Sequence, residues 1–269
     1  MLNSCLKFAV QIGRPVVRKV LLVCVLAVFP GVALADVLLA AASSVRAPVE
    51  SLISTYKNQT GNSVRVSYGS SGNLTHQILR GAPYDIFLSA DLGFPQKLYQ
   101  NLEIDEPIIY ARGSLDLYAS NKSNCDVNLG IAGLLSQVEA GAIKHIAIAN
   151  PELAPYGRAA MQVLEHSMRY EQLKDKLVFA ESVAQVNLFV QSGAVDVGLT
   201  AYSSVTGPTA ANIGAKRLAS TYYYDPIRQG ALVLGSDTAA SSPARQFVSY
   251  LCSPEATPIL STFGYNQAP

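Results

Sequence analysis

A short Gly/Ser turn between a strand and a helix is the feature of this sequence best suited to chemistry. Residues 68–91 read YGSSGNLTHQILRGAPYDIFLSAD, and a β-rich run over 64–68 stops at the Gly-Ser-Ser-Gly turn. A helical pattern of apolar residues follows, so the turn lies at a helix N-terminus. Backbone N–H groups, serine hydroxyls and the positive end of the helix dipole then face the same way, which favours a bound anion.

The same order of strand, turn and helix occurs three more times along the chain. Each time an apolar strand ends, small neutral donors follow, and a helical pattern begins. The turns are Ser43 with Ser44, residues 150–157 with Pro155-Tyr156-Gly157, and Glu181 with Ser182 and Val183. A single turn of this kind is an ordinary N-cap. Four helix starts that carry neutral donors predict convergence on one anion.

The first 35 residues have the pattern of a secretory signal peptide. Basic residues precede an apolar run over 20–29, and Ala33-Leu34-Ala35 supplies an A-x-A cleavage site. The alternative is a membrane anchor, but the apolar run is short for a bilayer span. We therefore expect residues 1–35 to be removed after Ala35 and the mature protein to be exported to the periplasm.

Charge and metal-ligating residues exclude several classes of partner. Residues 1–35 hold four basic and no acidic residues, so cleavage turns the formal net charge of +1 into about −3. Without a basic stripe, nucleic acid is an unexpected partner. The three histidines His76, His145 and His166 stand in unrelated contexts. No direct metal ligands and no cofactor are predicted, and an anion must be held by dipoles and hydrogen bonds.

Alternating strands and helices predict an α/β fold with mixed sheets flanked by helices. Breaks at 111–113 and 225–227 read as two crossings between lobes. Lobe I is then 36–112 plus 228–269, lobe II is 113–227, and a ligand cleft lies between the lobes. Strands are expected at 37–42, 63–68, 84–89, 107–111, 115–119, 145–149, 177–180, 196–200, 215–219 and 230–234. Helices are expected at 45–60, 73–81, 93–100, 129–137, 157–168, 183–192, 242–251 and 254–262.

Seven motifs in order resemble a known family. They are AAASS (40–44), YGSSGNL (68–74), GAPYDIFLSAD (81–91), ANPELAPYG (149–157), AESV (180–183), DVGLTAYS (196–203) and YLCSPEATPILSTFGY (250–265). Over nearly all of 37–266 the chain resembles the periplasmic molybdate-binding proteins of ABC importers. The resemblance implies a two-lobed periplasmic-binding-protein-like fold of type II, with the ligand between the lobes.

The resemblance also implies a set of anion contacts. Ser43 and Ser71 match serine donors, whereas Tyr156 and Val183 match positions that donate a backbone N–H. Some relatives add a tyrosine hydroxyl, but the aligned residue here is Ala201 and Tyr202 stands one place late. Ser44 is the candidate for the missing contact. The resulting oxyanion-binding set is Ser43, Ser44, Ser71, Tyr156 and Val183.

The resemblance implies that the protein captures molybdate, and also tungstate, and delivers the ion to the membrane permease of an ABC importer. The protein is expected to act as a monomer. A fully deprotonated dianion needs only donors, and we expect the nearby Glu181 to point away. Arg46 and Arg158 stand within a turn of the proposed contacts, either as ion pairs to the anion or, as we favour, as solvated first-turn arginines. The alternatives are another oxyanion such as sulfate, and a sensor without a transport role.

Catalysis is not expected. Ser54-Thr55-Tyr56-Lys57 fits the S-x-x-K motif of serine β-lactam enzymes. It falls near the end of a predicted helix rather than at its start, and no S-D-N or K-T-G partner motif occurs. The chain is therefore predicted to be a binding protein and not an enzyme.

Overall fold

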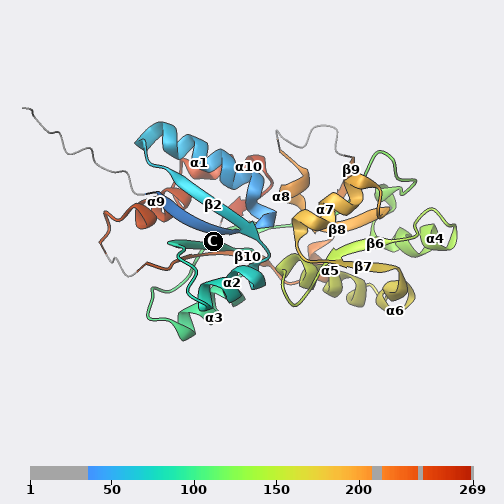
Figure 1. Cartoon of the computed structure of the whole chain (residues 1–269). Helices are drawn as coiled ribbons and strands as arrows, with labels where there is room; N and C mark the ends of the chain where they lie inside the picture. Colours follow the sequence, from blue (N-terminus) through green and yellow to red (C-terminus); the bar gives the residue numbers. More distant parts are fainter. Residues whose placement is uncertain (1–35, 208–213, 236–238, 268–269) are drawn as a thin grey trace, which may run out of the picture. The chain divides into compact units, whose positions relative to one another are not determined.

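In the computed structural model, which describes residues 36–207, 214–235 and 239–267, the chain builds two mixed β-sheets covered by helices (Figure 1). The first sheet has the order β11-β4-β10-β3-β1-β2, and the second has the order β7-β6-β8-β5-β9. The strands of the first are β1 (Val37–Ala42), β2 (Val64–Gly69), β3 (Ile86–Ser89), β4 (Ile108–Gly113), β10 (Ile227–Val233) and β11 (Asn266–Gln267). Those of the second are β5 (Leu115–Ala119), β6 (Ile146–Ala149), β7 (Leu177–Ala180), β8 (Val197–Ala201) and β9 (Ala215–Leu218).

The position of strand β1 inside the first sheet explains its continuous apolar sequence. It pairs in parallel with β2 and β3, so it lies inside the sheet with both faces covered. Leu39 and Ala41 pack in one core with α1 (Arg46–Thr60), α9 (Pro243–Leu251) and α10 (Ala256–Thr262). Ala40 packs in a separate core with α2 (Ser71–Leu79) and α3 (Gly93–Asn101) on the other face (Figure 1).

The second sheet has one continuous core. Helices α5 (Pro155–His166) and α7 (Val183–Ser192) both contact its inner strands β6 and β8. Shorter helices complete it: α4 (Leu134–Glu139), α6 (Tyr170–Leu173) and α8 (Tyr202–Val205). Strands β6, β7 and β8 are parallel, whereas β5 runs antiparallel to β8 and β9. This mixture confirms the predicted α/β fold with mixed sheets.

The chain crosses between the sheets twice. Strand β4 ends at Gly113 and β5 begins at Leu115 in the second sheet, and the chain returns to the first sheet at Ile227. The lobe boundaries proposed from the sequence, 36–112 plus 228–269 and 113–227, stay a prediction. Residues 1–35, the predicted signal peptide, lie outside the described residues. Within the described ranges, no helix is both long and apolar enough to cross a membrane.

Several elements differ from the sequence-based expectation. Strand β10 begins at Ile227 rather than at 230, because Gln229 is a fully buried polar residue that interrupts the apolar pattern without ending the strand. Helix α4 is confined to Leu134–Glu139, since two 3-10 turns, Val127–Leu129 and Ile131–Gly133, replace the start of the helix predicted over 129–137. The short elements α6, α8 and β11 were not predicted.

Candidate oxyanion-binding site

The first predicted contact pair lies where β1 ends. Ser43 and Ser44 begin the 3-10 turn Ser43–Val45, which continues directly into α1, and both side chains are buried. The Ser43 Oγ accepts a hydrogen bond of 3.3 Å from the N–H of Ala184, the second residue of α7. The turn after β1 in the first sheet therefore touches the N-terminus of a helix that covers the second sheet.

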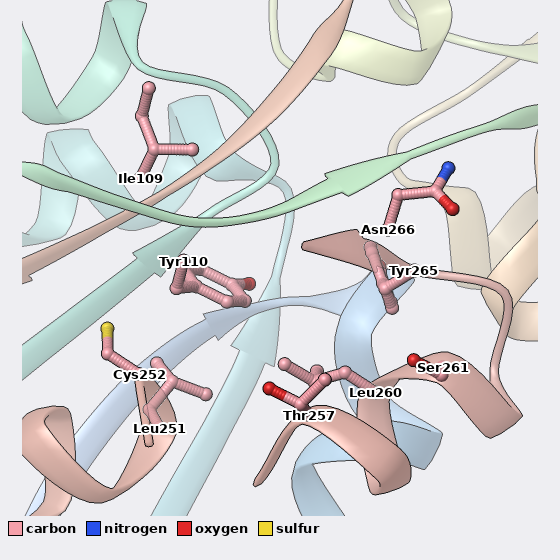
Figure 2. Close-up of a pocket in the computed structure, with 9 residues that line it drawn as sticks. All are labelled: Ile109, Tyr110, Leu251, Cys252, Thr257, Leu260, Ser261, Tyr265 and Asn266. Carbon is pink, nitrogen blue, oxygen red and sulfur yellow. The ribbon is translucent and has the colours of Figure 1, made fainter. Parts of the chain in front are cut away.

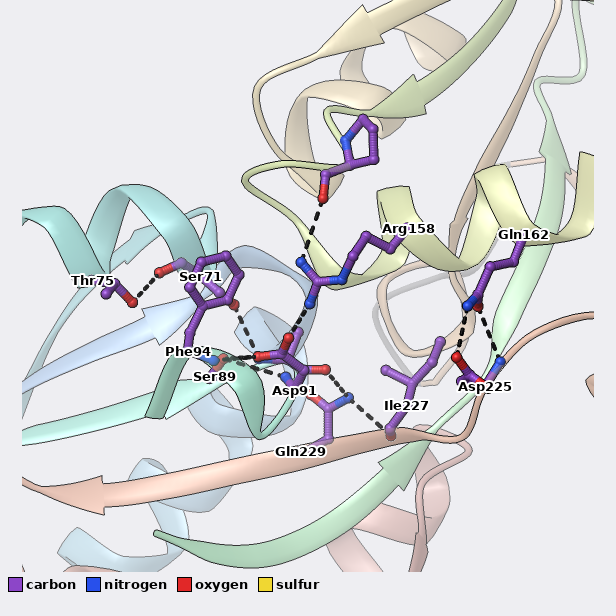
Figure 3. Close-up of polar contacts among 12 residues, drawn as sticks. Ser71, Thr75, Ser89, Asp91, Phe94, Arg158, Gln162, Asp225, Ile227 and Gln229 are labelled. Atoms are coloured by element: carbon purple, nitrogen blue, oxygen red, sulfur yellow. Dashed lines mark hydrogen bonds and ion pairs between the residues drawn. The ribbon is translucent and has the colours of Figure 1, made fainter. Parts of the chain in front are cut away.

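The second contact lies at the start of α2. Ser70 caps this helix by accepting from the Asn73 N–H at 3.4 Å, and Ser71 is the first helical residue. The Ser71 side chain is 1% exposed, and its Oγ accepts from the Ala90 N–H at 3.1 Å (Figure 3). In both bonds the serine oxygen is the acceptor, so the single hydroxyl hydrogen of Ser43 and that of Ser71 remain free to be donated to another group.

The third contact lies at the start of α5, where Pro155 occupies the first turn. Tyr156 follows it, and N–H groups in the first turn have no partner within the helix. A Cβ at Gly157 would overlap the Ala149 carbonyl oxygen, so only glycine lets the first turn lie directly on the end of β6. The Pro-Tyr-Gly sequence thus fixes where the Tyr156 N–H is presented.

The fourth contact is Val183, the first residue of α7. Ser182 caps the helix by accepting from the Gln185 N–H at 3.4 Å, and Val183 is buried. Beside the cap, the Glu181 carboxylate accepts from the side-chain amide of Asn73 on α2. The negative charge of Glu181 is therefore engaged with a donor on α2, a helix that packs on the first sheet.

Three contacts bring the four helix starts together. Ser43 accepts a hydrogen bond from Ala184, and Asn73 donates one to Glu181. The Gly72 N–H donates to the Leu153 carbonyl at 2.8 Å. Two of the joined segments follow strands of the first sheet and two follow strands of the second. The segments that carry Ser43, Ser71, Tyr156 and Val183 are thus neighbours, and they present hydroxyl and N–H donors at positive helix ends.

Ser44 adds a further polar group to this cluster. It is 1% exposed, and its Oγ has no hydrogen-bond partner among the described residues. The ring of Tyr202 packs against the backbone of Gly264, where a Cβ would overlap it. Ala201, the aligned position, is the buried last residue of β8. The role of Ser44 as an anion contact stays a prediction.

The side chain of Tyr156 has a role that the sequence did not indicate. It is fully buried, and its hydroxyl lies against Gly113, where any Cβ would overlap it. Burial, followed by the neighbouring Tyr265 hydroxyl, raises its pKa, and burial raises the pKa of Tyr265 to about 12. Both hydroxyls therefore stay protonated at neutral pH. Tyr156 thus anchors the start of α5 to the end of β4, where the chain crosses between the sheets.

The expectation that Arg158 is a solvated arginine is wrong. Its guanidinium forms an ion pair with Asp91, which follows β3, and donates to the Pro151 carbonyl at 3.4 Å (Figure 3). The Asp91 carboxylate is additionally held by the Ser89 hydroxyl at 3.0 Å and the Phe94 N–H at 3.2 Å. Arg46 lies over the Tyr68 ring at 4.0 Å from its centroid, is half exposed, and pairs with Glu50 on the same helix at 3.6 Å.

Loss of the Arg158–Asp91 pair is expected to weaken anion binding moderately, because the pair joins the two sheets without touching the predicted contacts. We expect Asp91→Asn to raise the Kd by about two- to fivefold, since a partly exposed ion pair contributes about 0.5–1 kcal/mol. The loss should shrink at high salt. Glu171→Gln, which breaks the exposed pair of Glu171 on α6 with Lys174 just after it, is the matched control. Equal affinities for Asp91→Asn and wild type at low salt would contradict the expectation.

The groups that converge at the site differ in chemistry from those of a metal centre. Among the described residues, no group of three or more His, Cys, Asp or Glu side chains is placed to hold a metal ion. The donors that converge are neutral hydroxyls and N–H groups, which suit an anion and not a cation.

Comparisons with known proteins show the family to which the chain belongs. Residues 37–266 match the family model described as bacterial extracellular solute-binding protein. The molybdate-binding protein ModA of Azotobacter vinelandii is 35% identical over 86% of this chain and 90% of its own. ModA of Rhodobacter capsulatus is 33% identical over 86% and 88%. Both relatives are binding proteins and not enzymes, which confirms the prediction that the chain is not an enzyme.

The fold is shared with solved structures of the same kind. The periplasmic molybdate-binding protein of Azotobacter vinelandii superposes with a TM-score of 0.78 at 33% identity, covering 87% of this chain and all of that one (100%). The sulfate-binding protein SubI of Mycobacterium tuberculosis, at 12% identity and a TM-score of 0.67, shares the fold alone. The chain belongs to the bacterial extracellular solute-binding protein family.

Proposed function

We propose that this protein captures molybdate, and also tungstate, in the periplasm and delivers it to the membrane permease of an ABC importer. The observation that carries the proposal is the junction of four helix starts at Ser43, Ser71, Tyr156 and Val183. The relatives named for molybdate binding support the choice of anion. Cleavage after Ala35 would release a monomer whose lobes, 36–112 plus 228–269 and 113–227, close on the ion.

The donor set favours a fully deprotonated tetrahedral dianion. Phosphate keeps a proton near neutral pH and needs an acceptor for it, but the nearby carboxylate of Glu181 is engaged with Asn73. Each charge-assisted hydrogen bond contributes about 1.5–3 kcal/mol. Five such bonds, from Ser43, Ser44, Ser71, Tyr156 and Val183, would together contribute about 7.5–15 kcal/mol before desolvation losses, a range that includes the roughly 8 kcal/mol of a micromolar complex.

Molybdate is expected to stabilise the mature protein against heat. A ligand that binds only the folded state at about 100 times its Kd adds roughly 2.7 kcal/mol to the free energy of unfolding. Thermal unfolding of residues 36–269 should therefore shift upward with molybdate and tungstate, and much less with sulfate at the same concentration. Equal shifts with sulfate and molybdate would contradict the proposed selectivity, and sodium chloride at matched ionic strength is the control.

A further inference from the structure

The C-terminal segment is linked to the candidate site through two buried hydroxyls. Tyr265 precedes β11 in the first sheet, and its hydroxyl lies 2.9 Å from the Ser203 Oγ on α8, beside the second sheet. The Ser203 Oγ in turn donates to the Ser44 carbonyl at 2.9 Å. All three side chains are buried, with Ser203 and Tyr265 at 3% exposure. A continuous polar link therefore runs from the C-terminal segment to the turn after β1.

The donor and the acceptor of each hydrogen bond in this link can be assigned, because each hydroxyl has a single hydrogen. The Ser44 carbonyl has no hydrogen, so Ser203 must donate to it, and this uses the single hydrogen of Ser203. Tyr265 must therefore donate to Ser203 and not accept from it. The Tyr265 oxygen remains an acceptor, and it faces the buried Tyr156 hydroxyl, which has no hydrogen bond of standard geometry to any described residue. The order of the hydrogen bonds is thus Tyr265, Ser203 and finally the Ser44 carbonyl.

We propose that Tyr265 is a positioning residue for anion binding, which fixes the turn of Ser43 and Ser44 through Ser203. The inference rests on the proposed function, because it assigns a role at the same site. Tyr265 itself does not contact the ion. Its effect passes through the Ser44 peptide, and hydrogen bonds in such a chain strengthen one another in a buried setting.

A second buried tyrosine provides a matched control. Tyr110 on β4 and Tyr265 both line a cavity of about 270 Å³, together with residues of α9 and α10 (Figure 2). The Tyr110 hydroxyl is buried and has no hydrogen-bond partner among the described residues. Replacing either tyrosine by phenylalanine removes one buried oxygen from the same core, but only the change at Tyr265 breaks the link to Ser44.

The test measures molybdate affinity by calorimetry and thermal unfolding without ligand for Tyr265→Phe, Ser203→Ala, their double variant and Tyr110→Phe. One neutral hydrogen bond corresponds to roughly a threefold to tenfold change in Kd. We expect that loss for Tyr265→Phe and for Ser203→Ala. The double variant should lose little more than the larger single loss, because both changes break one link. Tyr110→Phe should bind within about twofold of wild type, on the same scale of Kd.

Each result decides the inference. Wild-type affinity in Tyr265→Phe would overturn it, and so would an equal loss in Tyr110→Phe, which would indicate general loosening of the core. Additive losses in the double variant would show that Tyr265 and Ser203 act separately and would also overturn it. A wild-type protein that binds neither molybdate nor tungstate would overturn the proposed function together with this inference. Intact wild-type binding with an unaffected Tyr265→Phe overturns the inference alone.

Discussion

Replacement of Ser71 by alanine is expected to weaken molybdate binding by roughly tenfold to hundredfold. The Ser71 Oγ already accepts from the Ala90 N–H, so its hydrogen is available to an anion, and a charge-assisted bond contributes about 1.5–3 kcal/mol. Ser43→Ala should give a loss of the same size, because Ser43 accepts from Ala184 in the same way. Calorimetric titration of each variant measures the change.

The two serine variants should differ in stability although they resemble each other in affinity. Ser71→Ala leaves the buried Ala90 N–H without its partner, which costs about 1–3 kcal/mol of unfolding free energy. Ala184 is exposed, so in Ser43→Ala its N–H can form a hydrogen bond with water instead. Ser70→Ala is the control, because it removes an N-cap worth about 1 kcal/mol without a predicted anion contact. A larger loss of affinity in Ser70→Ala than in Ser71→Ala would show that Ser70, and not Ser71, contacts the anion.

Gly72→Ala is expected to lower anion affinity by roughly tenfold to hundredfold through a backbone clash. A Cβ at position 72 would lie 2.9 Å from the Leu153 Cα, at the point where the Gly72 N–H donates to the Leu153 carbonyl. Backbone cannot move aside as a side chain can, and overpacking of this kind costs about 1–3 kcal/mol. The start of α2 would then separate from the segment before α5, and the donors would no longer converge.

The same change should not destabilise the first sheet and its helices. Alanine favours a helix over glycine by up to about 1 kcal/mol, so α2 itself should gain stability. Gly235→Ala is the control, because a Cβ there meets no described atom within 4 Å. Comparison of the Kd and the melting temperature without ligand separates the two effects. Wild-type affinity in Gly72→Ala would show that α2 and residue 153 are apart in the bound state.

The helix starts of the site could be predicted because local chemistry determines them. Glycine, serine and proline at 69–72 and 155–157 stop a strand and cap a helix within a few residues, so the pattern is complete in the sequence. The apolar strands were found for a similar reason, since β1 is covered on both faces and keeps no polar position. The convergence of the helix starts could be predicted only because the pattern of strand, turn and helix is repeated along the chain.

Contacts between distant residues could not be predicted in this way. Arg158 and Asp91 are 67 positions apart, and nothing in either local sequence distinguishes a paired arginine from a solvated one. The side chain of Tyr156 reaches Gly113 only because α5 lies directly on the end of β6. Strand β11 has two residues, too few to show a period. Each of these features depends on how the sheets are placed and not on local propensity.

The link through Tyr265 illustrates the same limit. The C-terminal motif YLCSPEATPILSTFGY carries the family resemblance, yet its last tyrosine gives no sign of a partner at Ser203. Only the burial of both hydroxyls and the single hydrogen of Ser203 assign the direction of the link. Polar groups of this kind are expected where function requires a fixed geometry inside a packed core.

We propose that four helix starts form one site for a fully deprotonated oxyanion. Calorimetric titration of residues 36–269 with molybdate, tungstate, sulfate and phosphate, at one pH and ionic strength, measures this directly. We expect saturable binding of molybdate and tungstate at one ion per chain, weaker binding of sulfate, and binding of phosphate weaker by roughly hundredfold or more, about 2.7 kcal/mol. Binding of phosphate as tight as that of molybdate, or no heat with any of the four ions, would contradict it.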